Sequence, residues 1–194
     1  MQLAWLLITV VVVVLAVGGY MVVTRVFAKR TYVSKTSGLE FSHPFMWSRM
    51  SPVEFAQKMG DARWAELMNE TVVVNSTTRP TQAITASSMP GLDPALWDAI
   101  KAELLASLND LLVTPDPGIG VPAPLEYYDY TTPGSSMGIE GKFELAIAGE
   151  SAKMRFVFIM HGSTAYLIIY LNSNTNANVD AEWQKIRDSV AFTR

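Results

Sequence analysis

Few side chains in this sequence could carry out chemistry, and the two histidines are the first to consider. His43 stands beside a proline in "SHPF", and His161 lies in the turn-like "MHG". Two imidazoles need further ligands to form a zinc site, and the chain has no cysteine to supply one. We therefore interpret each histidine as a turn or strand-end residue, and we predict no metal site and no thiol nucleophile.

Serines and asparagines offer two other possibilities. The pairs Ser87–Ser88 and Ser135–Ser136 lie in loop-like settings, but neither has the G-x-S-x-G context of a hydrolase nucleophile. In the run "NSNTNANVD" (172–180), residues with side-chain oxygens stand at every second position, as the ligands of a calcium loop do, but the run lacks the glycine and glutamate of an EF-hand. We interpret it as a polar turn in which Asn178 or Asp180 caps a helix. The sequence thus predicts no catalytic residue and no cofactor.

Charge is distributed unevenly along the 194 residues. Four of the 15 basic residues, Arg25, Lys29, Arg30 and Lys35, precede the first acidic residue, Glu40. All 18 acidic residues follow, so the main part of the chain is acidic although the net charge is only -3. An acidic domain lacks the positive surface that nucleic-acid binding requires. We therefore predict no nucleic-acid partner.

Several elements are predicted to position these side chains. Apolar and polar residues alternate in "GLEFSHP", as in a strand, and this strand is predicted to end at Pro44. A helix is predicted to begin at "SPVEF", with Ser51 as its cap and Glu54 completing a capping box. Two strands flank a turn at 76–80. A second helix is predicted after Asp93, which caps it, and its apolar residues recur at three- and four-residue spacing.

The second half predicts a meander of strands. Four strand-like runs follow one another from "LEYYDYTT" to "STAYLIIYLNS", and the last two are almost continuously apolar, as central strands are. A helix, "VDAEWQKIRDSV", and a short strand, "AFTR", close the chain. The proline-rich stretch 114–124 is predicted to be a surface loop. Strands with helices around an antiparallel sheet indicate an α+β fold.

Three stretches resemble a known family. They are "GLEFSHPFMW", the "GIEGKFELAIAG" to "MRFVFIMHG" meander, and the closing segment with Tyr166, Trp183, Ser189 and Phe192. Together they resemble the PsbP-like α/β/α sandwich, a family that includes the extrinsic photosystem II protein, bacterial relatives and a Ran-binding nuclear import factor. The resemblance covers residues 37–194 and implies an accessory or assembly role in a larger complex. Its motifs are structural, so it transfers no catalytic residue.

The first residues predict a membrane anchor. Residues 3–24 carry no charge, and as a helix of about 33 Å they would match the ~30 Å hydrocarbon layer. Trp5 and Tyr20 lie near the two interfaces, while Gly18 and Gly19 would permit close helix contact or simply be tolerated in lipid. A cleavable signal is the alternative, but the chain begins "MQ" without a positive n-region.

The basic flank predicts the orientation. Arg25, Lys29 and Arg30 follow the apolar run and nothing basic precedes it, which favours a cytoplasmic domain; an extracytoplasmic or lumenal domain is the alternative. We therefore divide the chain into an anchor with its basic flank, residues 1–30, and a PsbP-like domain, residues 31–194.

A partner surface is predicted beside the membrane, where apolar side chains crowd one turn: Phe45, Met46, Trp47 and Met50. The first functional hypothesis is a non-enzymatic accessory subunit or assembly factor, with membrane lipid and other membrane protein subunits as partners. Two alternatives remain open. One is a tethered carrier with an apolar ligand between sheet and helices, near Trp97, Tyr127, Phe143 and Phe158. The other is a hydrolase with an unrecognised site.

Overall fold

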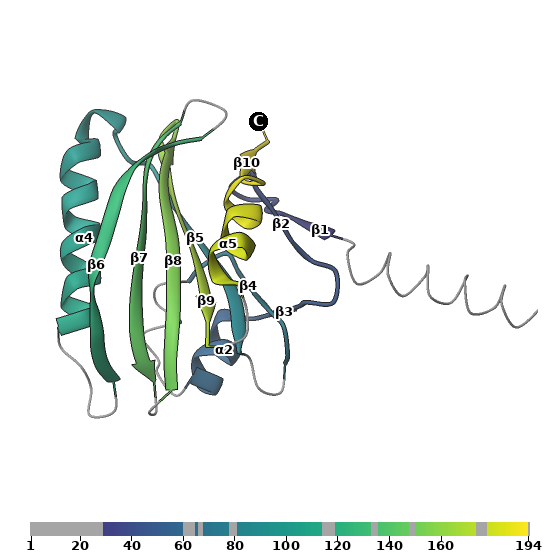
Figure 1. Cartoon of the computed structure of the whole chain (residues 1–194). Helices are drawn as coiled ribbons and strands as arrows, with labels where there is room; N and C mark the ends of the chain where they lie inside the picture. Colours follow the sequence, from purple (N-terminus) through teal and green to yellow (C-terminus); the bar gives the residue numbers. More distant parts are fainter. Residues whose placement is uncertain are drawn as a thin grey trace, which may run out of the picture.

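One large antiparallel sheet forms the centre of the molecule (Figure 1). The computed structural model describes residues 29–59, 65, 68–77, 81–113, 119–132, 136–147, 150–173 and 178–193. Seven strands are hydrogen-bonded in the order β3-β4-β5-β9-β8-β7-β6. Their bounds are β3 Ser48–Met50, β4 Thr71–Val74, β5 Gln82–Pro90, β6 Ile119–Thr131, β7 Met137–Ile147, β8 Glu150–His161 and β9 Thr164–Asn172.

The central strands are those with the most continuous apolar sequence, as predicted. β9 pairs with β5 on one side and with β8 on the other, and its residues after Thr164 are all buried. A strand covered on both faces needs apolar side chains in both directions, which explains "AYLIIYL".

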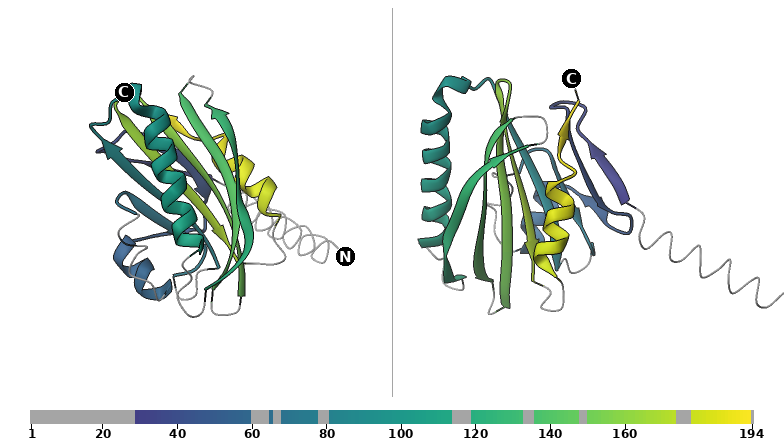
Figure 2. Two further views of the ribbon diagram at one scale, coloured as in Figure 1. Left: turned by 90° about the vertical axis from the view of Figure 1, so that its left-hand side faces the viewer. Right: turned by 45° about the horizontal axis from the view of Figure 1, so that its top comes forward.

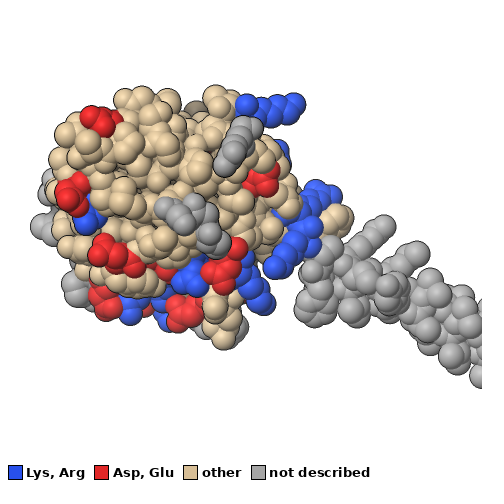
Figure 3. Space-filling view, turned by 90° about the horizontal axis from the view of Figure 1, so that it is seen from above, with Lys and Arg blue, Asp and Glu red and all other residues tan. Residues whose placement is uncertain are grey.

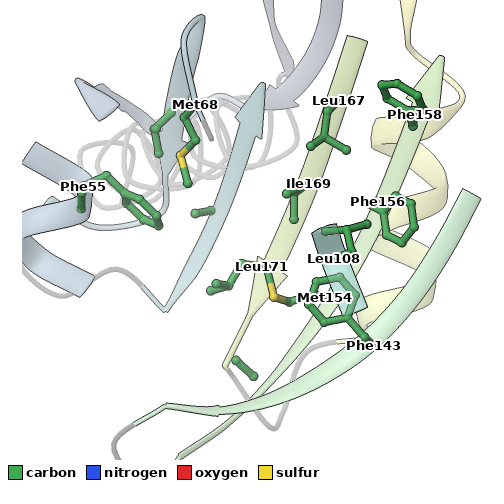
Figure 4. Close-up of a cluster of buried hydrophobic side chains, with 14 of the residues drawn as sticks. Phe55, Met68, Leu108, Phe143, Met154, Phe156, Phe158, Leu167, Ile169 and Leu171 are labelled. Carbon is green, nitrogen blue, oxygen red and sulfur yellow. The ribbon is translucent and has the colours of Figure 1, made fainter. Parts of the chain in front are cut away.

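Two helices cover the first face of the sheet. They are α2 Pro52–Met59 and α4 Trp97–Val113, which follows a short 3-10 turn at Pro94–Leu96. Both predicted caps are present: Ser51 accepts from the Glu54 amide at 3.1 Å, and Asp93 accepts from the Ala95 amide at 2.9 Å. Figure 4 shows the core beneath them, in which the side chains of Phe55 and Leu108 lie among those of the strands.

The opposite face is covered by α5 Val179–Arg187 and a small three-stranded sheet. That sheet has the order β1-β2-β10, with β1 Lys29–Val33, β2 Leu39–Pro44 and β10 Ala191–Phe192. The two views of Figure 2 place α4 on one side of the large sheet, and α5 with the small sheet on the other. A second core lies between them and includes Phe41, Tyr166, Tyr170 and Trp183.

The predicted α+β fold with helices around an antiparallel sheet is confirmed, and one detail is wrong. We predicted a loop over 114–124, but β6 begins at Ile119 and runs through both Pro122 and Pro124. β6 is an edge strand of the large sheet, and its register shifts twice between Gly120 and Glu126. Proline lacks a donor, so a strand of this kind is where a sheet tolerates it.

The anchor prediction falls on residues that the structure does not describe. Within the described ranges, no helix has both the length and the apolarity needed to cross a membrane, and the predicted span of residues 3–24 lies outside them. The predicted boundary between residues 30 and 31 falls inside β1, because Lys29 and Arg30 pair with Pro44 and His43.

Candidate functional site

Two neighbouring cavities open on the α5 side of the molecule and share His43 and Trp47. One has a volume of about 320 Å³ and reaches α5, where Glu182, Lys185 and Ile186 line it. The other, of about 490 Å³, is lined by Arg30, Thr31, His43, Trp47, Ser48 and Arg49. We call the second one the arginine pocket. It lies between the β1–β2 hairpin and the edge strand β3.

Strand register brings two arginines to this pocket from opposite walls. Arg30 lies opposite His43 in the β1–β2 pair, two residues from the buried Tyr32, so it belongs to the hairpin face that looks toward the large sheet. Arg49 lies opposite Val73, a residue of the second core, so it belongs to the sheet face that looks toward the hairpin. The two guanidinium groups therefore converge on one space.

Each guanidinium rests on an aromatic ring rather than on a carboxylate. The central carbon of Arg30 is 4.1 Å from the ring centre of Phe45, and that of Arg49 is 4.9 Å from the ring centre of Tyr32. Among the described residues, neither arginine forms an ion pair. Ring stacking fixes the plane of a guanidinium and leaves its N–H edges available for an anion.

His43 forms the buried back of both cavities. It is 3% exposed, and its Nδ1 lies 3.0 Å from the carbonyl oxygen of Pro44, which can only accept a hydrogen bond. Burial lowers the pKa of His43 most strongly, and the charges of Arg49 and Arg30 lower it further, although the bond to Pro44 opposes the shift. The ring is therefore neutral near pH 7, with Nδ1 as the donor.

A polar network borders the smaller cavity. Tyr170 donates to Glu182, and Gln82 Nε2 donates to the Glu182 carboxylate at 2.9 Å. Burial, followed by the hydrogen bond and charge of Glu182, raises the pKa of Tyr170 well above its ordinary value. The phenol therefore stays protonated, and the network attaches α5 to strands β5 and β9.

The predicted partner surface divides into exposed and buried parts. Met46 is 69% exposed at the turn between β2 and β3, and Phe45 and Trp47 are half-buried. Trp47 packs on Tyr170, with ring centres 6.4 Å apart. Met50 is 6% exposed and belongs to the first core, because its position in β3 points it to the sheet face opposite that of Arg49. The prediction that Met50 contacts a partner is therefore wrong.

The other predicted site residues fall into two groups. Trp5, Gly18, Gly19, Tyr20 and Arg25 lie outside the described residues. Lys29 and Arg30 are exposed residues of β1 and lie at the two cavities. Figure 3 shows Lys and Arg side chains gathered on its right-hand side.

The carrier hypothesis gains no support from the residues named for it. Phe143 and Phe158 are buried in the first core, where Phe158 stacks on Trp97 with ring centres 5.4 Å apart. Tyr127 does not join them, since it is 52% exposed on the edge strand β6. The named side chains therefore belong either to core packing or to the exposed edge of the sheet.

The remaining candidates for chemistry lie elsewhere. His161 is next to Ser136, whose hydroxyl oxygen is 2.8 Å from its Nδ1, and its ring stacks on Phe192. In the described ranges, no carboxylate bonds to His161, and no three His, Cys, Asp or Glu side chains could hold a metal ion. Asn178 accepts from the Ala181 amide at 3.2 Å, so the predicted cap of the last helix is confirmed.

Arg49 is the functional candidate that sequence reasoning missed. It is one polar residue in the three-residue strand "SRM", and nothing in its spacing separates it from an ordinary surface arginine. Its importance depends on the pairing of β3 with β4 and on the hairpin that folds over it. Both are long-range features, so a local pattern could not have revealed them.

Comparisons with known proteins identify the fold. No family model matches the chain, and no curated protein matches it either. Among solved structures, a protein from Bacteroides thetaiotaomicron VPI-5482 has a TM-score of 0.52 and 13% identity over 85% of this chain, which spans only 48% of that protein. The cyanobacterial PsbP (CyanoP) of Synechocystis sp. PCC 6803 has a TM-score of 0.61 and 10% identity over 86% of this chain and 93% of its own. The predicted resemblance is thereby confirmed at the level of structure: this chain has a PsbP-like fold.

Proposed function

We propose that the protein is an accessory subunit or assembly factor of a larger membrane protein complex. A helix over residues 3–24 holds it in the membrane, and the domain lies on the cytoplasmic side, as the basic flank favours. The PsbP-like fold supports this role by analogy, because the resemblance implies accessory proteins of larger complexes.

One observation carries the proposal. Lys29, the first residue of β1, pairs with Pro44, so the turn with Phe45 and Met46 lies beside the point where the chain arrives from the predicted anchor. An apolar side chain as exposed as Met46 at that end of the domain is suited to contact a neighbouring subunit close to the bilayer.

The test is gentle solubilisation of native membranes followed by native electrophoresis. We expect the full chain to migrate within a high-mass assembly, and Met46→Ser to release a substantial fraction of it. Leu96→Ser is the matched control, because Leu96 is also strongly exposed, at 56%, but lies on the α4 side of the sheet. Migration of the unaltered chain alone, at 21.4 kDa plus detergent, would contradict the proposal.

The tether and its orientation have separate tests. Extraction with alkaline carbonate should leave the protein in the membrane fraction. Protease added to sealed vesicles of known orientation should cleave the domain only from the cytoplasmic side, and cleavage only from the opposite side would support the extracytoplasmic alternative.

A second candidate function, hydrolysis, is favoured by one contact. Ser136 and His161 form a hydroxyl–imidazole pair, which is the minimum that an activated serine nucleophile requires. The pair lies where β7 and β8 meet and lacks an orienting carboxylate among the described residues. Ester and amide substrates, assayed with the full chain and with Ser136→Ala, would test it. Loss of a measurable activity in the variant would support hydrolysis.

A further inference from the structure

The arginine pocket has the arrangement of an anion-binding site. Two guanidinium groups approach it from separate structural units, Arg30 from the small sheet and Arg49 from the large one. Neither is paired with a described carboxylate. We propose that this pocket binds the phosphate group of a phosphate ester.

Convergence of two arginines is costly unless something compensates for it. Like charges repel, and both guanidinium groups line one pocket with His43, whose pKa is lowered by burial first and by the charges of Arg49 and Arg30 after it. A bound anion would relieve this repulsion. The stacking of Arg30 on Phe45 and of Arg49 on Tyr32 holds both cations in place before a ligand arrives, which reduces the entropy lost on binding.

Phosphate suits this geometry better than a carboxylate does. A carboxylate is planar, and the two parallel N–H groups of one guanidinium can bond both of its oxygens. A tetrahedral phosphate instead offers oxygens to donors on several sides. Here the two guanidinium groups come from opposite walls of the pocket. Trp47 provides an apolar surface for the rest of the ester.

The size of the pocket allows a small headgroup and more than a bare ion. Its volume of about 490 Å³ lies within the usual range of small-molecule sites. Such a phosphate has two possible sources. It can belong to an anionic lipid headgroup, which the nearby start of β1 would bring within reach, or to a soluble phosphate ester. Only the lipid source depends on the membrane tether proposed above.

The experiment uses the full chain in zwitterionic detergent micelles and follows the amide and indole NMR signals of Trp47. One arm adds inorganic phosphate, and the other adds dihexanoyl phosphatidylglycerol. We expect saturable shifts at Trp47, and we expect Arg49→Gln to weaken binding about tenfold or more, as loss of a charge-assisted hydrogen bond does. Arg30→Gln serves as the second variant if Arg49→Gln perturbs the fold.

Lys35→Gln is the matched control. Lys35 is exposed in the turn after β1, at the other end of the β1–β2 hairpin from the pocket, so its loss removes the same charge without touching the pocket. We expect it to change affinity less than twofold. Saturation by phosphate alone identifies a soluble source, and saturation by the lipid alone identifies a headgroup; both support the proposal. Equal losses in Arg49→Gln and Lys35→Gln would overturn it, as would failure of both probes to saturate.

The result of the phosphate titration does not depend on whether the proposed function is correct. The micelle titration does not require the chain to span a bilayer or to have a protein partner. Failure of binding together with high-mass migration would refute the pocket alone, whereas saturable binding by a chain that washes free in carbonate would refute the tether alone.

Discussion

Glu70 is held by hydroxyl groups from separate parts of the chain. Its carboxylate accepts hydrogen bonds from Ser34 at 2.6 Å, from Ser88 at 2.5 Å and from Tyr32 at 3.1 Å. Tyr32 and Ser34 lie in and just after β1, and Ser88 lies in β5, so this one residue fastens the small sheet to the large one. The same Tyr32 ring supports the guanidinium of Arg49.

This arrangement makes stability depend on the charge of Glu70. Burial alone would raise the pKa of Glu70, but hydrogen bonds from Ser34, Ser88, Ser37 and Tyr32 outweigh it and lower the pKa below its ordinary value. A carboxylate with a lowered pKa in the folded state stabilises the fold above its unfolded pKa of about 4.5, and that stability is lost as pH falls below it.

We expect Glu70→Gln to lower the free energy of unfolding by about 1–3 kcal/mol at pH 7, because an amide cannot accept as many hydrogen bonds as the carboxylate. The difference in unfolding free energy between the variant and the unaltered chain should shrink as pH is lowered from about 5 to 3. Denaturant unfolding at several pH values measures it, with Glu103→Gln on the exposed side of α4 as the control. A difference that stays constant across this range would contradict the account.

His43 should make phosphate binding depend on pH. Because its pKa is lowered, the ring is neutral at pH 7, and a bound anion would favour the protonated form. Affinity for a phosphodiester, whose own charge does not change in this range, should therefore rise as pH falls from 7.5 to 5.5. The other charged groups around the ring are Arg30, Arg49, Lys29, Lys185 and Glu182. His43→Gln should abolish most of the increase, as titrations at the two pH values would reveal.

The positions of some individual residues could be predicted from sequence, and those of others could not. Sequence reasoning named Phe45, Met46 and Trp47 correctly as a crowded apolar turn, since hydrophobic side chains beside a proline are visible locally. It misplaced Met50, whose burial depends on which face of β3 it occupies. A single step along a strand reverses that face, so the error lies in the register rather than in the residue type.

At the scale of elements, the attachment of α5 decides the shape of the candidate site. Trp183 donates to the buried carboxylate of Glu140 at 2.5 Å, and Arg187 forms an ion pair with the same group at 2.9 Å. Asp180, at the start of the helix, pairs with Arg155 of β8 at 2.8 Å. These contacts fix the helix that forms one wall of the smaller cavity.

We expect Trp183→Phe to destabilise the fold by about 2–4 kcal/mol, because it both removes buried volume and leaves a Glu140 oxygen without its donor. Trp97→Phe is a matched control: Trp97 stacks on Phe158 in the other core, and no hydrogen bond of its indole is found among the described residues. Trp97→Phe should lower the free energy of unfolding by about 1 kcal/mol or more less than Trp183→Phe does. Chemical denaturation compares the two, and equal costs would show that the indole hydrogen bond is unimportant.

Helices could be predicted from sequence because their ends are marked locally. The side chains of Ser51 and Asp93 each accept a hydrogen bond from a backbone amide two or three residues later, and both bonds are present in the structure. The first part of β6 could not be predicted in this way. Its prolines indicate a loop unless one knows that the strand lies at an edge, and sheet order is a property of the whole chain.

For the whole molecule, one sheet with two differently covered faces separates two regions. The α4 side consists mainly of apolar packing, whereas the α5 side contains the arginine pocket, the buried histidine and the exposed Met46. The resemblance to PsbP-like proteins could be recognised because apolar strands, turns and the closing helix leave local signatures. The pocket could not, since it exists only where the small sheet folds over the large one.

This asymmetry predicts which part of the domain approaches the membrane. The predicted anchor ends at residue 24 and β1 begins at Lys29, so the connecting residues can span at most about 18 Å. Lys29 pairs with Pro44, which keeps the β2–β3 turn and the arginine pocket at that end. The helix α4 lies on the far side of the large sheet (Figure 2).

The full chain in nanodiscs that contain a gadolinium-chelating lipid should reveal this orientation. We expect strong broadening of NMR signals from residues 29–31 and 45–49, and little effect on residues 97–108 of α4, because paramagnetic relaxation falls steeply with distance. Arg49→Gln should leave this pattern intact, since the anchor and the β1–β2 pairing set the distance and the pocket does not. Uniform broadening of both regions would mean that the domain turns freely on its tether, and stronger broadening of α4 would mean that the opposite face meets the bilayer.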